Sequence, residues 1–284
     1  MIPVTSVRTL PEAYAVLGQR LRGLRVLAGG TDFMVALNAR VGLERIGHVL
    51  DIWSVAELRG LERRGATLCL GALTTYTELM GSPLVRDLFP ALALVSNEVG
   101  AWGIQNRGTL GGNVCNASPA GDTLPLLLAA DARFVLGGPR GERIVPASEF
   151  FLGYRKTALG ADELLLRVEL PIVEGARIVY RKVGTRRAQS ISKTLVAVRG
   201  VCQGGRLWQV RVAAGCVAPV PLRCRNTEVA VEGKRIEPAV LEAARAALQI
   251  DIKPIDDVRS TVEYRRKVSA NVLERLLRQL QCES

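Results

Sequence analysis

Two glycine-bearing loops contain the residue types expected of an anion-binding site. The first is Ala28-Gly29-Gly30-Thr31-Asp32, and the second, far along the chain, is Thr109-Leu110-Gly111-Gly112-Asn113. Backbone amides can approach a diphosphate closely only where no Cβ intervenes. The hydroxyl, amide and carboxylate groups beside the glycines can bind phosphate oxygens and ribose hydroxyls. The pattern therefore predicts that both loops bind one nucleotide cofactor.

The side chains beside the glycines differ in what they can bind. Thr31 and Thr109 supply hydroxyl donors. Asp32 suits a ribose or ribityl hydroxyl better than phosphate, because two anions in contact repel each other. The sequence contains neither Gly-x-Gly-x-x-Gly nor Gly-x-x-x-x-Gly-Lys-Ser/Thr, so a Rossmann fingerprint and an NTPase phosphate loop are both excluded.

Groups that could carry chemistry by themselves are scarce in this chain. The six cysteines include no Cys-x-x-Cys pair and the single histidine is His48, so neither a zinc site nor a cysteine-ligated cluster is predicted. Most of the cysteines are expected to be buried, reduced thiols, and His48 is expected to be structural. No nucleophile or acid–base pair stands out, which is typical of a protein whose cofactor carries the reaction.

The elements around the loops are predicted from apolar periodicity and capping signals. A strand at 25–28, the glycine turn and a helix through 33–37 would place main-chain donors at a helix start. Asp122 is placed to cap a helix over 124–130, and Thr75-x-x-Glu78 has capping-box spacing. Further helices are predicted at 11–24, 90–100, 237–249 and 258–281, and further strands at 48–52, 67–72, 133–136, 163–170, 177–183, 195–202 and 207–216, with a hairpin turn at 138–141.

The charge of the chain leaves several classes of partner open. Lys and Arg number 38 against 27 Asp and Glu among 284 residues, a formal net charge of +11. Such a balance suits nucleic acid, an anionic cofactor or an acidic protein. The cations are dispersed and aromatic residues are 5% of the chain, so stacking platforms for bases are few. A basic nucleic-acid-binding module is the less favoured alternative.

A longer run of residues around the second loop resembles a known family. The segments 104–113 and 116–122 are similar to the flavin subunit of the molybdenum hydroxylase (xanthine dehydrogenase) family, including the carbon monoxide dehydrogenase flavoprotein type. The resemblance extends in the family's order to Val26–Phe33, Gly153–Thr157, Leu165–Pro171, Tyr180–Arg187 and Glu263–Arg266. Gln105 departs from the family, which often has arginine there, so no arginine role is assigned to that position.

The resemblance implies an α+β fold with two domains. Residues 1–172 would form a two-part FAD-binding domain of the PCMH type, similar to vanillyl-alcohol oxidase, with subdomains of about 1–60 and 61–172. Residues 173–284 would form a C-terminal sheet-plus-helix domain of the carbon monoxide dehydrogenase flavoprotein type. FAD would be bound noncovalently in the groove between the two parts.

The resemblance also implies which residues bind FAD. Leu165 would make an apolar contact and Lys182 a polar one, whereas helix capping by Asp122 and simple surface exposure of Lys182 are the alternatives. No residue is predicted to be catalytic or to ligate a metal. The implied cofactor-binding residues are Val26, Leu27, Ala28, Gly29, Gly30, Thr31, Asp32, Phe33, Thr109, Gly111, Gly112, Asn113, Asp122, Leu165 and Lys182.

A subunit of this family would relay electrons. The resemblance implies a molybdopterin-binding large subunit and a [2Fe-2S] small subunit as partners, in a dimer of heterotrimers, with FAD passing electrons from the iron–sulfur clusters to an external acceptor. NAD, dioxygen, a quinone and ferredoxin all remain open as acceptors. A cytoplasmic location without a membrane span is expected. The alternative enzyme is a free-standing FAD-dependent oxidase or reductase.

Overall fold

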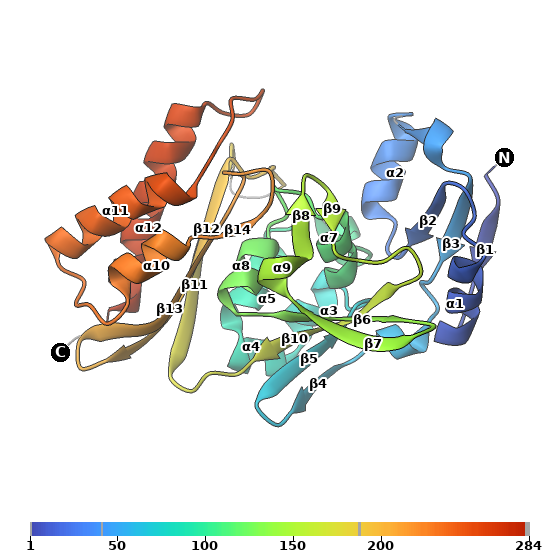
Figure 1. Ribbon diagram of the computed structural model, residues 1–284, viewed down its shortest axis with the longest axis horizontal. Helices are drawn as coiled ribbons and strands as arrows, with labels where there is room; N and C mark the ends of the chain where they lie inside the picture. The colour runs from blue at the N-terminus through green and yellow to red at the C-terminus, as the bar shows by residue number, and fades with distance from the viewer. Residues whose placement is uncertain (1, 41, 187–188, 282–284) are drawn as a thin grey trace.

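The first subdomain is a small parallel sheet with a helix after each of its first two strands. The computed structural model describes residues 2–40, 42–186 and 189–281. The sheet order is β1-β3-β2, and both strand pairs are parallel. Figure 1 shows this unit at the N-terminal end of the molecule. Its elements are β1 (Val4–Ser6), α1 (Leu10–Gly18), β2 (Leu24–Leu27), α2 (Thr31–Asn38) and β3 (His48–Asp51).

The second subdomain is a five-stranded antiparallel sheet with order β4-β5-β10-β6-β7. Leu68, Leu70 and Phe134 on this sheet are buried with the helices that cover it. Its strands are β4 (Leu61–Arg64), β5 (Thr67–Gly71), β6 (Arg133–Gly138), β7 (Gly141–Pro146) and β10 (Leu164–Pro171), beside the hairpin of β8 (Phe151–Gly153) and β9 (Lys156–Thr157). Its helices are α3 (Tyr76–Gly81), α4 (Pro83–Leu88), α5 (Pro90–Asn97), α6 (Trp102–Gln105), α7 (Leu110–Asn116), α8 (Leu124–Ala129) and α9 (Ala147–Phe150).

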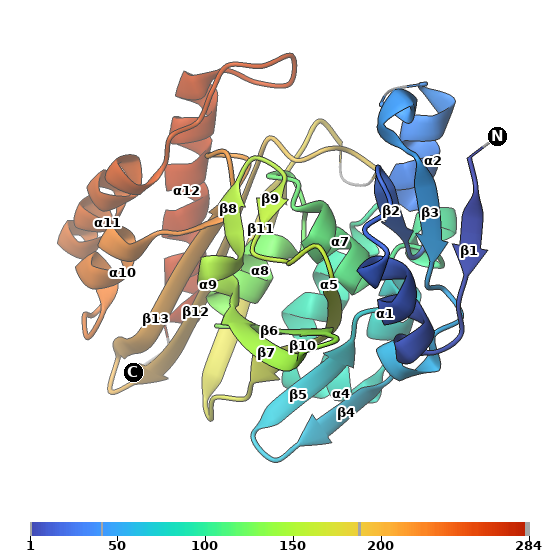
Figure 2. The same ribbon diagram turned by 45° about the vertical axis from the view of Figure 1, so that its right-hand side comes forward.

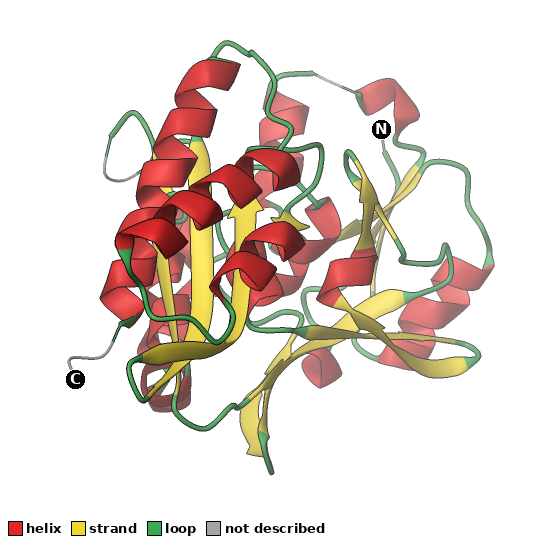
Figure 3. Cartoon of the chain, turned by 60° about the vertical axis from the view of Figure 1, so that its left-hand side comes forward, coloured by secondary structure: helices red, strands yellow, loops and turns green. Residues whose placement is uncertain are grey.

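The C-terminal domain is an antiparallel sheet covered by helices on one face, as Figure 3 shows. Val272, Leu276 and Leu280 form the buried stripe of the last helix, which packs on the sheet with its neighbours. The elements are β11 (Ala176–Val183), β12 (Thr194–Gln203), β13 (Arg206–Gly215), β14 (Leu222–Arg223), α10 (Arg225–Val231), α11 (Pro238–Asp251) and α12 (Val262–Leu280).

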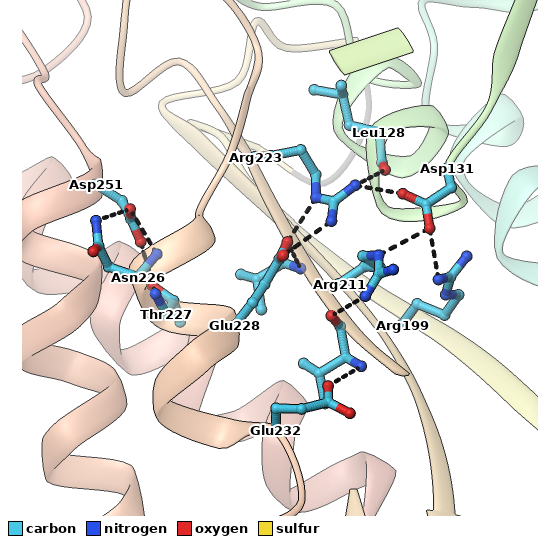
Figure 4. A network of polar contacts seen from close by, with 12 residues as sticks. Leu128, Asp131, Arg199, Arg211, Arg223, Asn226, Thr227, Glu228, Glu232 and Asp251 are labelled. Carbon is cyan, nitrogen blue, oxygen red and sulfur yellow. Dashed lines mark hydrogen bonds and ion pairs between the residues drawn. The ribbon is translucent and has the colours of Figure 1, made fainter. Parts of the chain in front are cut away.

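The other face of the C-terminal sheet packs against α8 of the second subdomain. Ala197 and Ala213 of this face are buried in the same apolar cluster as the α8 leucines. At the end of α8, Asp131 accepts hydrogen bonds from three arginines of the C-terminal domain, Arg199, Arg211 and Arg223 (Figure 4). The two domains therefore share a core and a partly buried charge cluster.

Some element boundaries differ from those expected. The helix expected over 11–24 ends at Gly18, because the chain turns through Arg20, whose φ of 48° lies in the left-handed region. Helix α10 was not expected from the sequence. The capping box at Thr75 and Glu78 is confirmed by both of its hydrogen bonds, and the hairpin between β6 and β7 closes at Gly138 and Gly141 as predicted.

Candidate cofactor-binding site

The two glycine loops meet in the folded chain. A Cβ built on Gly29 would lie 1.6 Å from the carbonyl oxygen of Arg107 and 3.2 Å from the amide nitrogen of Gly108. The Arg107 guanidinium also donates to the carbonyl of Gly29 at 3.4 Å. Helices α2 and α7 begin within the two loops, and Figures 1 and 2 both show them on either side of the subdomain boundary. Gly29 is required here because any side chain would separate the loops.

The first loop begins a helix whose start is capped by no side chain of the described residues. Gly30 is the N-cap of α2 with φ of 80°, and it provides no side-chain cap. The first amides of a helix have no intrahelical acceptor and carry the positive end of its dipole. The loop residues 27–31 and Phe33 are partly exposed, while Val26 and Asp32 are exposed. This turn of α2 can bind an anion through its main chain.

The second loop is held tightly from within. Thr109 is the N-cap of α7, and its hydroxyl accepts from the amide of Gly112 at 3.0 Å. The amide of Gly111 donates to the carbonyl of Ala72 at 2.9 Å, and a Cβ on Gly111 would lie 2.6 Å from that oxygen. Gly111 is therefore explained by the packing of α7 on the end of β5. Its amide is not available to a phosphate, contrary to the role expected for it.

An aromatic stack supports the contact between the loops. The guanidinium of Arg107 lies 3.7 Å from the centroid of the Trp53 ring, and that of Arg59 lies 4.5 Å from it. Arg59 also donates to the main-chain oxygen of Trp53 at 2.9 Å. Trp53 follows β3, so the stack joins the first subdomain to the second loop by cation–π attraction. The sequence alone did not predict this group, because Arg107 lies far along the chain from Trp53 and Arg59.

Asp122 and Lys182 form an ion pair between the two domains. Lys182 Nζ lies 2.6 Å from Asp122 Oδ2, and the Ser192 hydroxyl donates to Asp122 Oδ1 at 2.6 Å. The Lys182 side chain is 4% exposed, so the alternative of an exposed surface lysine is wrong. Helix capping by Asp122 is also wrong, because Thr123 is the N-cap of α8 and no side chain caps it. Burial raises the pKa of Asp122, against the opposing effect of Lys182.

Glu98 and Tyr180 extend this polar group. Lys182 donates to the main-chain oxygen of Glu98 at 3.1 Å. Burial raises the pKa of the Glu98 carboxyl, which Lys182 and a hydrogen bond from Tyr180 oppose. Glu98 Oε2 is buried without a hydrogen-bond partner. Neither residue was predicted, and the only sequence signal was the position of Tyr180 at the start of the segment that resembles the family.

Tyr76 is buried, and its amide donates to the carbonyl of Gly108, just before the second loop. Burial raises the pKa of its hydroxyl, and the charges of Asp122 and Asp32 raise it further. The Thr123 hydroxyl donates to Asn113 Oδ1 at 2.7 Å, so a hydrogen bond joins the start of α8 to the second loop.

Leu165 lies apart from these polar groups. It is 4% exposed and belongs to the apolar cluster beneath α7, whereas Leu164 and Leu166 belong to the cluster shared with the first subdomain. Strand β10 therefore carries the two subdomain cores on its two faces. The structure brings the two loops together and pairs Asp122 with Lys182, whereas Leu165 lies in the apolar core.

Comparisons with known proteins identify the family of the chain. Residues 1–173 match the model of the FAD binding domain in molybdopterin dehydrogenase, and residues 179–280 match the CO dehydrogenase flavoprotein C-terminal domain. The carbon monoxide dehydrogenase medium chain of Hydrogenophaga pseudoflava is 31% identical over 95% of this chain and 93% of its own. The xanthine dehydrogenase FAD-binding subunit of Escherichia coli O157:H7 is 30% identical over 90% of this chain and 88% of its own.

A solved structure shows the same fold. Carbon monoxide dehydrogenase from Hydrogenophaga pseudoflava superposes with a TM-score of 0.92 at 31% identity, covering 96% of this chain and 95% of the other. The chain belongs to the family of FAD-binding subunits of molybdopterin dehydrogenases. The expected family, the α+β fold, the FAD cofactor and the oxidoreductase class are confirmed. Within the described residues, no helix is long and apolar enough to cross a membrane.

Proposed function

We propose that the diphosphate of FAD lies between the first turn of α2 and the second glycine loop. The observation that carries this proposal is the direct contact of Gly29 with the main chain of Arg107. That contact joins the loop that begins α2, which has no side-chain cap, to the segment just before Thr109, the N-cap of α7. Gly30 and Thr31 would donate main-chain hydrogen bonds, and the Thr31 hydroxyl would add a donor.

The polar side chains around Tyr76 would bind the sugar part of the cofactor. Asn113 uses its carbonyl oxygen to accept from Thr123, which leaves its amide group to donate. Asp32 is exposed and would accept from a ribose or ribityl hydroxyl. Both Asp122 oxygens are already bonded to Lys182 and Ser192, so Asp122 would act chiefly by fixing Lys182 beside the cofactor.

The bound flavin would supply the redox chemistry by accepting and releasing electrons. The residues of this chain would bind and orient the cofactor, and the buried Lys182–Asp122 pair would place a fixed dipole near it. Leu165 would support α7 from below through its place in the core. We propose no catalytic residue and no metal ligand in this chain.

The partners follow from the family. Because the matched relatives are named medium chains and FAD-binding subunits, we propose that this chain assembles with a molybdopterin-binding large subunit and a [2Fe-2S] small subunit. A dimer of such heterotrimers in the cytoplasm is the proposed form. The proposed division of this chain is a FAD-binding domain over 1–172, with parts of about 1–60 and 61–172, and a C-terminal domain over 173–284.

Co-expression with the proteins encoded beside it tests the proposed function. Native mass spectrometry is expected to find three different chains in equal numbers, with one FAD for each copy of this chain. The flavin of the complex is expected to be bleached when a substrate of the large subunit is added, and acid denaturation is expected to release it. A lone chain that turns over substrate would favour the free-standing oxidase or reductase instead.

A further inference from the structure

A cavity lies between the two domains. It has a volume of about 450 Å³ and is lined by α4, α5, the chain from the end of β10 into β11, and single residues of β12 and α12. Volumes of roughly 300–1,000 Å³ are typical of small-molecule sites. None of the residues expected to bind FAD lines it. The cavity is therefore separate from the proposed cofactor site.

The walls of the cavity are largely apolar, with a buried cation among them. Phe89, Leu94, Ile172 and Ile178 contribute apolar surface, and Arg199 lines the cavity from β12. Arg199 lies directly opposite Ile178 in the pairing of β12 with β11. Its side chain is only 5% exposed, although arginine is rarely buried unless its charge is paired.

The pairing of Arg199 is incomplete. Its Nη2 donates to Asp131 Oδ2 at 2.8 Å, but Arg211 Nε donates to the same oxygen at 2.8 Å. Arg223 Nη1 donates to the other oxygen of this carboxylate, Asp131 Oδ1 (Figure 4). Arg199 Nε is buried and has no hydrogen-bond partner. Three guanidinium groups thus share one carboxylate, and only Arg223 has a second one, on Glu228.

The chemistry of the Arg199 guanidinium limits the kind of ligand that the cavity can bind. A guanidinium can only donate hydrogen bonds, so whatever satisfies Arg199 must accept them. Burial lowers the pKa of Arg199, against the opposing charge of Asp131. An anion would supply both the missing acceptor and the missing charge, and charge-assisted hydrogen bonds of this kind are about twice as strong as neutral ones.

We propose that this cavity is a binding site for a small organic anion with an apolar body, held by Arg199 at its charged end and by the apolar walls along its length. Medium-chain carboxylates have this shape and charge. The exposed Arg177 at the same cavity would guide the anion toward it. The proposal does not depend on the FAD assignment, because none of the residues expected to bind FAD lines this cavity.

Calorimetric titration of the FAD-loaded full chain with octanoate tests the proposal. Saturable binding of one octanoate per chain is expected. Octanol, which has the same carbon chain and no charge, should bind at least about tenfold more weakly, since a hydrogen bond to a charged group contributes about 1.5–3 kcal/mol. Equal affinities would show that the cavity is only an apolar void and would overturn the proposal.

Two variants locate the binding. Ala176→Trp fills the cavity at a lining position and should weaken octanoate binding at least about tenfold. Ala247→Trp makes the same change at a partly exposed alanine of α11 outside the cavity and should leave it unaltered. Both should keep their FAD. Octanoate binding that survives Ala176→Trp would place the ligand elsewhere and contradict the proposal.

A third variant tests the guanidinium. Arg199→Lys keeps a cation beside Asp131 but removes Nε, and it should weaken octanoate binding about fivefold or more. If this variant does not fold, the octanol comparison and Ala176→Trp decide the matter. The titration is repeated on the assembled complex. Binding by the isolated chain that is lost in the complex would mean that a partner covers the cavity, and the proposal would then be wrong.

Discussion

Lys182 of β11 reaches Asp122, at the start of α8, at a distance of 2.6 Å. The two residues belong to different domains, and both side chains are largely withdrawn from solvent, with 4% and 12% of their surface exposed. Ser192 and the main-chain oxygen of Glu98 complete the group. A pair of this kind fixes the position of one domain against the other, because each charge would be costly to bury alone.

Breaking the pair should reduce both stability and FAD affinity. Lys182→Met leaves Asp122 buried without its cation, and the expected loss in free energy of unfolding is about 3 kcal/mol. The FAD dissociation constant is expected to rise at least about tenfold. Chemical denaturation of the apoprotein and fluorescence titration with FAD measure the two effects. Lys156→Met, at an exposed lysine of β9, is the matched control and should change neither.

The double variant separates the pair from its parts. Lys182→Met combined with Asp122→Asn removes both charges and should recover stability relative to Lys182→Met alone. The coupling energy of the cycle is expected to be at least about 1 kcal/mol. Additive losses would show that the two residues act independently and that the pair does not position the domains.

Because the two loops touch at Gly29, a single methyl group added at this residue should impair FAD binding. Gly29→Ala would place a carbon 1.6 Å from the Arg107 carbonyl, and the loops would have to separate. The variant is expected to be purified without FAD. Gly103→Ala in α6 is the matched control, since its Cβ would meet nothing within 4 Å. It should retain FAD. The ratio of flavin to protein absorbance decides, and a yellow Gly29→Ala protein would contradict the proposed site.

Alanine substitutions at Gly111 and at Gly30 should destabilise the protein for different reasons. Gly111→Ala would bring a Cβ to within 2.6 Å of the Ala72 carbonyl, so the apoprotein itself should unfold at a lower temperature. Gly30→Ala has room, with its nearest atom at 3.5 Å, but has φ of 80°. It should lose only about 1–2 kcal/mol from backbone strain. Thermal unfolding without FAD distinguishes the two, and equal losses would contradict the packing explanation of Gly111.

Local signals in the sequence predicted most of the elements around the site, but not helix α7, which begins at Leu110 within the second glycine segment. Several elements depend only on residues that are close together in the sequence. They are the strand, glycine turn and helix of the first loop, the capping box at Thr75 and the last apolar helix. Periodicity and capping report such local preferences directly. The end of α1 was missed because Arg20 adopts a left-handed conformation, which no residue type other than glycine signals strongly.

The partners of the charged residues could not be predicted in this way. Lys182 resembles a surface residue when only its charged neighbours in sequence are considered. Its burial depends on Asp122, which lies 60 residues away. Arg107 and Trp53 likewise meet only after the subdomains pack. Long-range pairing is set by the fold as a whole, so the family resemblance was needed to select Lys182 and Asp122.

The arginine cluster on Asp131 predicts a dependence of stability on acid pH. Burial alone would raise the pKa of Asp131, but Arg199, Arg223 and Arg211 outweigh it and hold the pKa below its ordinary value. A carboxyl with a lowered pKa stabilises the folded chain above the pKa of its unfolded form, about 3.9. This contribution is lost as the pH falls through the folded pKa.

Asp131→Asn isolates the charge, because asparagine tolerates the φ of 53° found at this residue. The variant should lose about 1–2 kcal/mol of unfolding free energy at pH 7, less than for a fully buried pair because Asp131 is 34% exposed. The gap between wild type and variant should narrow below about pH 4. Asp162→Asn, whose partner Arg140 is 75% exposed, should cost less than about 1 kcal/mol. Urea unfolding at several pH values measures all three proteins, and a gap for Asp131→Asn that is constant with pH would show that the arginines do not act through its charge.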